Sequence, residues 1–184
     1  MSLQKNVKNI LAELDGNASF ISEEQANNFV SEILAAKHIF LAGAGRSGLA
    51  VRAFGNRLLH LGFKVSIVGE ISSPHSQQGD LVIICSGSGE TGSLVSLAQK
   101  ASKSGVKIAL VSMRDESTIG KLASANLTLK GQVKGENEEK EFTQPMGAAF
   151  EQLAFLAFDG MVLELMDRKH ETSDSMFARH ADFE

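Results

Sequence analysis

Hydrophobic residues along the chain fall into short, almost uninterrupted runs that are separated by amphipathic stretches. Such runs are typical of parallel strands that helices cover on both faces, because these strands have no polar side. Their alternation with helical stretches predicts an α/β protein, which we expect to be a three-layer α/β/α sandwich. The five runs, rich in Val, Ile and Leu, span residues 38–43, 64–69, 80–86, 106–112 and 125–129.

Helical patterns occupy the N-terminal segment and the intervals between the predicted strands. Ser22 and Gln25 have the spacing of a capping box, and the two Glu residues after Ser22 suit the positive end of a helix dipole. A further helical stretch begins near Ser47, after the first strand. The helices predicted before the last strand span residues 3–15, 22–36, 47–62, 90–104 and about 117–123.

The C-terminal part holds one long helix between two polar segments. Residues 130–141 form a charge run, which predicts a solvated loop. The helix is expected from Met146 to about Lys169, with Pro145 in its first turn, where the missing N–H costs nothing. Since neither a linker nor a repeat interrupts the pattern, we predict one domain over residues 1–184. Its parts are the N-terminal helices (1–36), a βα core (37–130), the C-terminal helix (144–169) and a polar tail (170–184).

The amino-acid composition limits the classes of partner that we expect this chain to bind. The 184 residues carry a formal charge of −4, include no basic block, and contain neither Trp nor Tyr, so we expect no nucleic-acid partner. No apolar run reaches about 18 residues and no export signal is evident, so we expect a cytoplasmic protein that does not bind membranes. Cys85 is the only cysteine, which excludes an internal disulfide.

The first predicted strand ends in a glycine-rich loop, GAGRSG, at residues 43–48. This loop matches the G-x-G-x-x-G pattern, and Glu70 lies roughly where a dinucleotide-binding fold needs an acidic residue. Arg46 and Ser47, by contrast, are donors that suit a small anionic group. A third interpretation is that the glycines only permit a tight turn and close packing.

The third predicted strand ends in a second loop, SGSGETG, at residues 86–92. Its hydroxyl groups at Ser86, Ser88 and Thr91 are separated by glycines, and a helix follows, so backbone N–H and side-chain O–H groups can converge on one anion. Loops after the first and third strands of a doubly wound sheet can flank its ligand site. We therefore predict a phosphomonoester pocket, bound by Gly45, Arg46, Ser47, Ser86, Gly87, Ser88, Gly89 and Thr91.

Both loops resemble motifs of the sugar isomerase (SIS) domain family. Residues 86–91 match its pattern Ser-x-Ser-Gly-x-Thr, residues 45–48 match its first loop, and the resemblance covers residues 5–184. It implies a parallel sheet in the order 2-1-3-4-5, a sugar phosphate substrate and no cofactor. The length and the ending Arg179-His180-Ala181 are similar to the 6-phospho-3-hexuloisomerases. That resemblance implies interconversion of D-arabino-3-hexulose 6-phosphate and fructose 6-phosphate through an enediol.

Moving a carbonyl by one carbon needs a general base, and Glu151 is the candidate. It lies on a helical stripe whose other members are apolar, and a desolvated carboxylate accepts a proton more readily. Alternatively, Glu151 is exposed at the end of the stripe or pairs with an arginine. The resemblance places a catalytic Glu at this position. The apolar members of the stripe are Ala148, Phe155, Phe158 and Val162.

The histidines lack the spacing of metal ligands, so we expect no metal site. In related isomerases a histidine, often from a neighbouring subunit, helps to open the sugar ring, and His60 and His180 are both candidates. His60 could equally be a packed or interface histidine. Arg46 is either a phosphate or sugar ligand or a surface residue.

Other activities stay open within the same family. One alternative is an isomerase for arabinose 5-phosphate or sedoheptulose 7-phosphate, and another is a non-catalytic module that only binds a sugar phosphate. Apolar residues nearly all round the C-terminal helix, and an apolar stripe on the first helix, predict that the chain assembles with itself as a homodimer or homotetramer.

Overall fold

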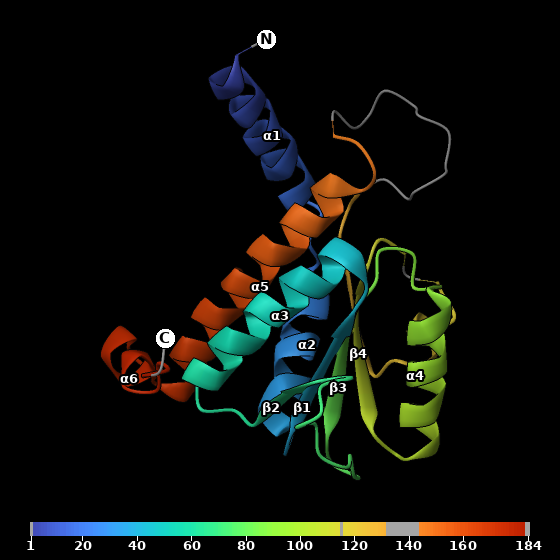
Figure 1. The fold of residues 1–184 in the computed structure, drawn as a ribbon. Helices are drawn as coiled ribbons and strands as arrows, with labels where there is room; N and C mark the ends of the chain where they lie inside the picture. Colours follow the sequence, from blue (N-terminus) through green and yellow to red (C-terminus); the bar gives the residue numbers. More distant parts are fainter. Residues whose placement is uncertain (1, 115, 132–143, 183–184) are drawn as a thin grey trace.

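The computed structural model describes residues 2–114, 116–131 and 144–182. At its centre lies a parallel sheet of five strands in the order β2-β1-β3-β4-β5 (Figure 1). The predicted fold class and strand order are therefore confirmed. The strands are β1 (Ile39–Gly43), β2 (Val65–Ile67), β3 (Leu81–Cys85), β4 (Lys107–Ser112) and β5 (Ala125–Thr128).

Helices cover both faces of this sheet. One face packs against α2 (Glu23–Ala35), α3 (Gly45–His60) and α5 (Ala148–Lys169), and the other against α4 (Gly92–Lys103) and the 3₁₀ turn η1 (Gly120–Leu122). Helix α1 (Leu3–Ala18) projects beyond these layers, and the short α6 (Ser173–Phe177) follows α5 (Figure 1).

The central strands are apolar on both sides because each side faces a different hydrophobic core. In β1, Ile39 and Leu41 join the core beneath α2, α3 and α5, whereas Phe40 and Ala42 join the core beneath α4. All four residues are buried. Alternate side chains thus enter opposite layers, as strand geometry requires, which explains the uninterrupted apolar runs.

Helix α5 begins two residues later than predicted. Met146 and Gly147 have φ angles of 59° and 77°, in the left-handed region, and the helix begins only after them, at Ala148. Pro145 therefore precedes the helix rather than lying in its first turn. This correction brings Gly147 to the N-cap and leaves Glu151 in the first turn of α5.

Several other boundaries differ from the predictions in smaller ways, among them the end of α1, which runs to Ala18 rather than to residue 15. Helix α3 begins at Gly45, helix α4 begins only at Gly92, and the helix predicted near residues 117–123 is the single turn η1. Ser22 caps α2 as predicted, but the Gln25 side chain accepts the backbone N–H of Thr128 at 2.9 Å. Most of the predicted 130–141 loop lies outside the described residues.

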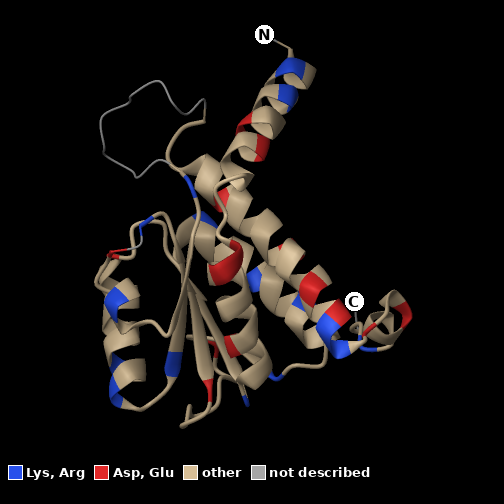
Figure 2. Cartoon of the chain, turned by 180° about the vertical axis from the view of Figure 1, so that it is seen from behind, with Lys and Arg blue, Asp and Glu red and all other residues tan. Residues whose placement is uncertain are grey.

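The predicted polar tail packs against the rest of its own chain. It contains α6, whose Met176 is buried in the core beneath α3 and α5. Basic and acidic residues are interspersed over the helices of the described part (Figure 2). No helix among the described residues is long and apolar enough to cross a membrane.

Candidate active site

A cavity of about 310 Å³ opens at the carboxyl ends of β1 and β3. These strands are neighbours, yet α3 leaves β1 on one face of the sheet and α4 leaves β3 on the other. Such a point, where the chain diverges to opposite faces, is where doubly wound folds bind ligands. The predicted site residues that line the cavity are Gly45, Ser47, Ser86, Gly87, Ser88, Thr91 and Glu151.

Three helices begin at this cavity. The N-caps of α3, α4 and α5 are Ala44, Thr91 and Gly147, all of which line it, and their helices show no side-chain capping hydrogen bond. Helices α1, α2 and α6 are each capped by a hydroxyl side chain. Uncapped helix N-termini offer backbone N–H groups and positive dipole ends to an anion. The cavity therefore suits a phosphate group without a lysine.

Hydroxyl groups add to these backbone donors. Ser47 and Ser86 are buried, and the Ser86 Oγ lies 3.3 Å from the Thr91 Oγ1. The Ser88 Oγ accepts the backbone N–H of Glu90 at 3.2 Å, so its own hydrogen can point elsewhere. The loops after β1 and β3 thus bring together the hydroxyls that the sequence placed about 40 residues apart.

The glycines of the first loop serve both packing and access. A Cβ at Gly48 would lie 2.6 Å from the carbonyl oxygen of Gly43, so these two glycines permit α3 to approach β1 closely. Gly45 has a φ of 58° and open space around it, at the mouth of the cavity. The packing interpretation is therefore correct for Gly43 and Gly48, while Gly45 lines the cavity.

The second loop is held from behind by the segment that follows β4. The Glu90 carboxylate accepts the backbone N–H of Thr118 at 2.6 Å, and this hydrogen bond lowers the pKa of Glu90. Gly89, with a φ of 65°, does not line the cavity, because it packs against Ser117. Its carbonyl oxygen accepts the N–H of Ile119 at 3.3 Å. Gly89 therefore shapes the loop from behind the cavity.

Two of the descriptions that the sequence left open for Glu151 apply together: it is a buried carboxylate, and it pairs with an arginine. It is buried, lines the cavity, and its Oε2 lies 3.1 Å from the Arg46 Nη1. On the predicted stripe, Phe158 and Val162 are buried, whereas Phe155 is 44% exposed. The carboxylate thus faces the cavity and is paired with an arginine at the same time, so its charge is balanced inside a wall of hydroxyl and apolar side chains.

Arg46 lies at the edge of the cavity rather than in its lining. Its side chain is 57% exposed and borders an adjacent apolar groove of about 460 Å³, which also reaches Glu151. Apolar side chains from three helices form the groove walls. They are Leu11 and Leu14 of α1, Leu49 and Ala50 of α3, and Phe155 and Leu156 of α5.

Cys85 lies at the base of the cavity, at the end of β3. Burial, and next the negative charge of Glu151, raise the pKa of its thiol to about 12, while a hydrogen bond with Ser47 opposes them. At neutral pH the thiol therefore stays protonated and is a poor nucleophile. Cys85 is therefore a buried strand residue with a free thiol.

His60 and His180 lie together, but away from the cavity. Since an α-helix rises about 1.5 Å per residue, His60 lies about 20 Å along α3 from Ser47. The two imidazoles stack with their centroids 5.1 Å apart and border a separate hollow of about 270 Å³ with Arg57. Within one chain, neither histidine reaches the site that contains Glu151.

A family model for the SIS domain matches residues 32–155. The chain belongs to the SIS domain family. This SIS domain is 44% identical to 3-hexulose-6-phosphate isomerase of Bacillus subtilis over the whole of both chains. It is 35% identical to 3-hexulose-6-phosphate isomerase of Methylomonas aminofaciens, covering 95% of this chain and 96% of that one. A Methanococcus jannaschii crystal structure, for which the same molecular function was inferred, matches with a TM-score of 0.79, 30% identity and 97% coverage of both chains.

Part of the SIS domain cavity was not anticipated from the sequence. Gly147 follows a proline and precedes a helical pattern, a signal that could have revealed its position at an N-cap. The apolar wall carried no such signal, because its residues belong to ordinary hydrophobic patterns. The additional lining residues are Ala44, Cys85, Leu94, Met113, Met146, Gly147 and Phe150.

Proposed function

We propose that this chain is an isomerase that interconverts D-arabino-3-hexulose 6-phosphate and fructose 6-phosphate. The observation that carries the proposal is one cavity in which three uncapped helix N-termini meet a buried carboxylate. The helix N-termini suit binding of a phosphomonoester, and the buried carboxylate suits proton transfer next to a carbonyl. The names of the two bacterial relatives agree with this chemistry.

The phosphate of the substrate binds at the deep end of the cavity. Ser47, Ser86, Ser88 and Thr91 donate hydroxyl hydrogen bonds, and the starts of α3 and α4 add backbone N–H groups. With the phosphate fixed, the carbon chain extends toward Glu151 at the start of α5. Binding energy from this non-reacting group then orients the sugar for proton transfer.

Glu151 is the general base. In fructose 6-phosphate it removes the proton from C3, and the electrons of that C–H bond form the C2=C3 double bond of an enediol. The protonated carboxyl then returns the proton to C2, and the O3 hydroxyl proton passes to O2, so that C2 carries a hydroxyl group as C3 becomes the carbonyl. Electrons move only within the sugar, so the step balances without an oxidant or a cofactor.

Arg46 stabilises the charge that develops in this step. In the resting enzyme its guanidinium neutralises the Glu151 carboxylate at 3.1 Å. When Glu151 takes up a proton, that negative charge passes to the sugar oxygens. The guanidinium, which is exposed on its other side, can then pair with the enediolate.

Ring opening is assigned to the histidines of a neighbouring copy. Helices α3 and α5 both begin at the Glu151 cavity, and both border the histidine hollow near their other ends. A two-fold axis perpendicular to this pair of helices would place α3 and α5 of a second copy antiparallel to those of the first. It would bring His60 and His180 of one copy toward the Glu151 cavity of the other.

Exposed apolar side chains support this assembly. Leu49 and Leu163, on α3 and α5, are each 68% exposed, and Leu59, Phe155 and Leu156 are also open to solvent. Apolar side chains exposed on two helices that pack against each other are typical of a protein interface. Helix α1 exposes a second stripe through Leu3, Val7 and Leu11, which could join two dimers into a tetramer.

The deciding experiment incubates the pure protein with ¹³C-labelled fructose 6-phosphate and follows the products by NMR. We expect the resonances of the 3-hexulose phosphate to appear, with slow deuterium incorporation at C2 or C3 in D₂O. Arabinose 5-phosphate and sedoheptulose 7-phosphate are assayed in parallel. Turnover of either in place of fructose 6-phosphate, or phosphate-ester binding without turnover, would reject the proposal.

A further inference from the structure

The stacked pair of histidines joins two distant parts of the chain. His60 is the last residue of α3 and is buried, whereas His180 belongs to the tail after α6. Their rings are inclined by 28° with centroids 5.1 Å apart. His180 itself is exposed. The place of His180 therefore depends on whatever fixes the tail.

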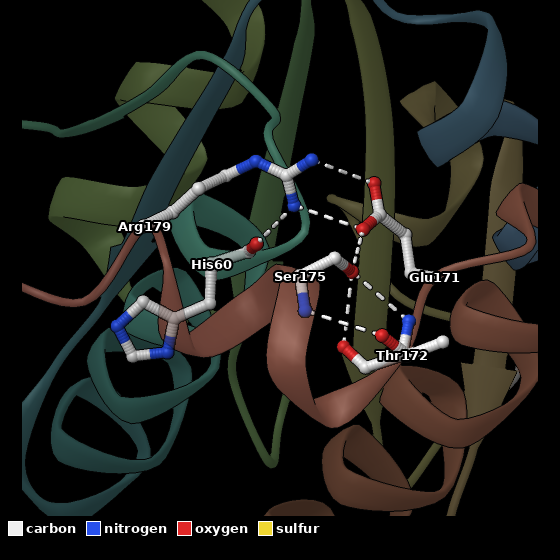
Figure 3. Close-up of polar contacts among 5 residues, drawn as sticks. All are labelled: His60, Glu171, Thr172, Ser175 and Arg179. Carbon is white, nitrogen blue, oxygen red and sulfur yellow. Dashed lines mark hydrogen bonds and ion pairs between the residues drawn. The ribbon is translucent and has the colours of Figure 1, made fainter.

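Arg179, next to His180, provides that attachment (Figure 3). Its Nη1 donates to the backbone carbonyl oxygen of His60 and to the Glu171 Oε2, both at 2.9 Å, and its Nη2 donates to the Glu171 Oε1 at 3.0 Å. This two-pronged arrangement is specific to arginine, because a lysine offers a point charge. One guanidinium thus ties the tail to the residue on which His180 stacks.

Glu171 is also held by contacts at the start of α6 that do not involve Arg179. Thr172 and Ser175 form a reciprocal capping box at the start of α6, with hydrogen bonds of 3.0 and 3.2 Å. The Ser175 hydroxyl also donates to the Glu171 carboxylate. The hydrogen bonds from Arg179 and then Ser175 lower the pKa of Glu171, so its carboxylate is charged at neutral pH.

The guanidinium also fits the turn that ends α3. Gly62 has a φ of 82°, and a Cβ there would lie 3.5 Å from the Arg179 Nε and 3.6 Å from its Cζ. A cation at this position interacts favourably with the negative end of the α3 dipole. Arg179 therefore lies against the end of α3, with 40% of its side chain still exposed.

We propose that Arg179 is a positioning residue, which holds the imidazoles of His60 and His180 as one unit for ring opening in the site of a second copy. This inference rests on the proposed function. Ring opening removes the proton of the C2 hydroxyl, breaks the C2–O5 bond and protonates O5. Two adjacent imidazoles can accept the first proton and donate the second, provided that both stay in place.

The first test compares Arg179→Met and Arg179→Lys with a matched control, Arg168→Met. Arg168 also binds a glutamate on α5, Glu164, but has no hydrogen bond with His60. We expect Arg179→Met to lower kcat for fructose 6-phosphate about 10- to 100-fold, with KM changed less than about threefold. Arg179→Lys should recover only part of the loss, and Arg168→Met should retain wild-type kcat.

The second test separates positioning from general stability by combining substitutions. In a His180→Ala background, Arg179→Met should lower kcat by a smaller factor than in the wild-type protein, because one of the two imidazoles that it positions is already absent. An equal fold-loss in both backgrounds would show a purely structural role and overturn the proposal. If Arg179→Met does not fold, Glu171→Gln provides the same comparison, since it removes the charge that binds Arg179.

The third test measures the environment of the two imidazoles by NMR. Imidazole ¹H–¹³C NMR spectra should show shifted His60 and His180 resonances in Arg179→Met and unchanged ones in Arg168→Met. Unchanged resonances together with wild-type kcat in Arg179→Met would refute the positioning role while leaving the isomerase intact. If the wild-type protein does not isomerise fructose 6-phosphate at all, the proposed function fails first, and the catalytic part of this inference falls with it.

Discussion

Glu151, in the first turn of α5, contacts both the cavity and an arginine. Its carboxylate lines the cavity that also contains the phosphate loops, and it pairs with Arg46, whose side chain is largely exposed. The buried Glu151 side chain has little room to move, whereas the exposed Arg46 side chain can move away. The ion pair can therefore break while the carboxylate stays in place. A carboxylate held in this way stays aimed at the substrate during both halves of a proton transfer.

Replacing Glu151 with Gln tests the role of that carboxylate. The amide keeps the shape but cannot accept a proton, so kcat should fall about 10²–10⁴-fold while KM changes little. Glu24→Gln is a matched control, because Glu24 lies in the first turn of α2 and is exposed. Steady-state assays with fructose 6-phosphate check this prediction, and near-normal turnover of Glu151→Gln would remove Glu151 from the mechanism.

At the scale of elements, the site is built from helix starts. Helices α3, α4 and α5 begin at the cavity without side-chain caps, although a hydroxyl cap typically stabilises a helix by about 1 kcal/mol. The N–H groups left in this way become available to an anion. A bound phosphate ester would then act as a shared cap, so its binding should also raise the stability of the protein.

Ser88→Ala combined with Thr91→Ala tests the phosphate loop. Each hydroxyl bonded to a charged phosphate contributes about 1–2 kcal/mol, so the double variant should lose about 2–4 kcal/mol of substrate binding. KM should rise and inorganic phosphate should compete less well. Ser96→Ala, an exposed position farther along α4, should change neither quantity. A wild-type KM in the double variant would place the phosphate elsewhere.

At the scale of the whole molecule, the proposed mechanism uses two groups of residues that lie apart in one chain. The Glu151 cavity and the hollow that contains His60 and His180 lie near opposite ends of α3 and α5. Between these ends the exposed faces of both helices carry leucines and a phenylalanine. Burial of this face against a second copy would remove apolar surface from water and also combine the two sites.

Mixing two inactive variants tests that assembly. Hybrids of Glu151→Gln and His60→Ala contain, in each dimer, one site with both groups intact, so activity should partly return after subunit exchange. Light scattering should show a dimer or a tetramer. Lack of recovery despite proven exchange would confine His60 to its own subunit, and a fully active monomer would contradict the whole arrangement.

Local patterns in the sequence were sufficient for the strands, the order of elements and the placement of the two glycine–hydroxyl loops at strand ends. Apolar runs determine which segments are buried on both sides, and the glycine–hydroxyl motifs lie at strand ends where ligands bind. The position of Glu151 on a mostly apolar stripe also followed from helical periodicity. Each of these inferences depends on residues that are close together in the chain.

Tertiary structure decided what depends on residues far apart in the chain. Only the packed molecule pairs Glu151 with Arg46, brings the starts of three helices to one cavity, and places His60 with His180 away from it. The tail, which by its polarity had no evident core to join, is held by Arg179 on Glu171 and on the end of α3. Periodicity describes which side of an element is buried, but the partner it meets depends on how the whole chain packs.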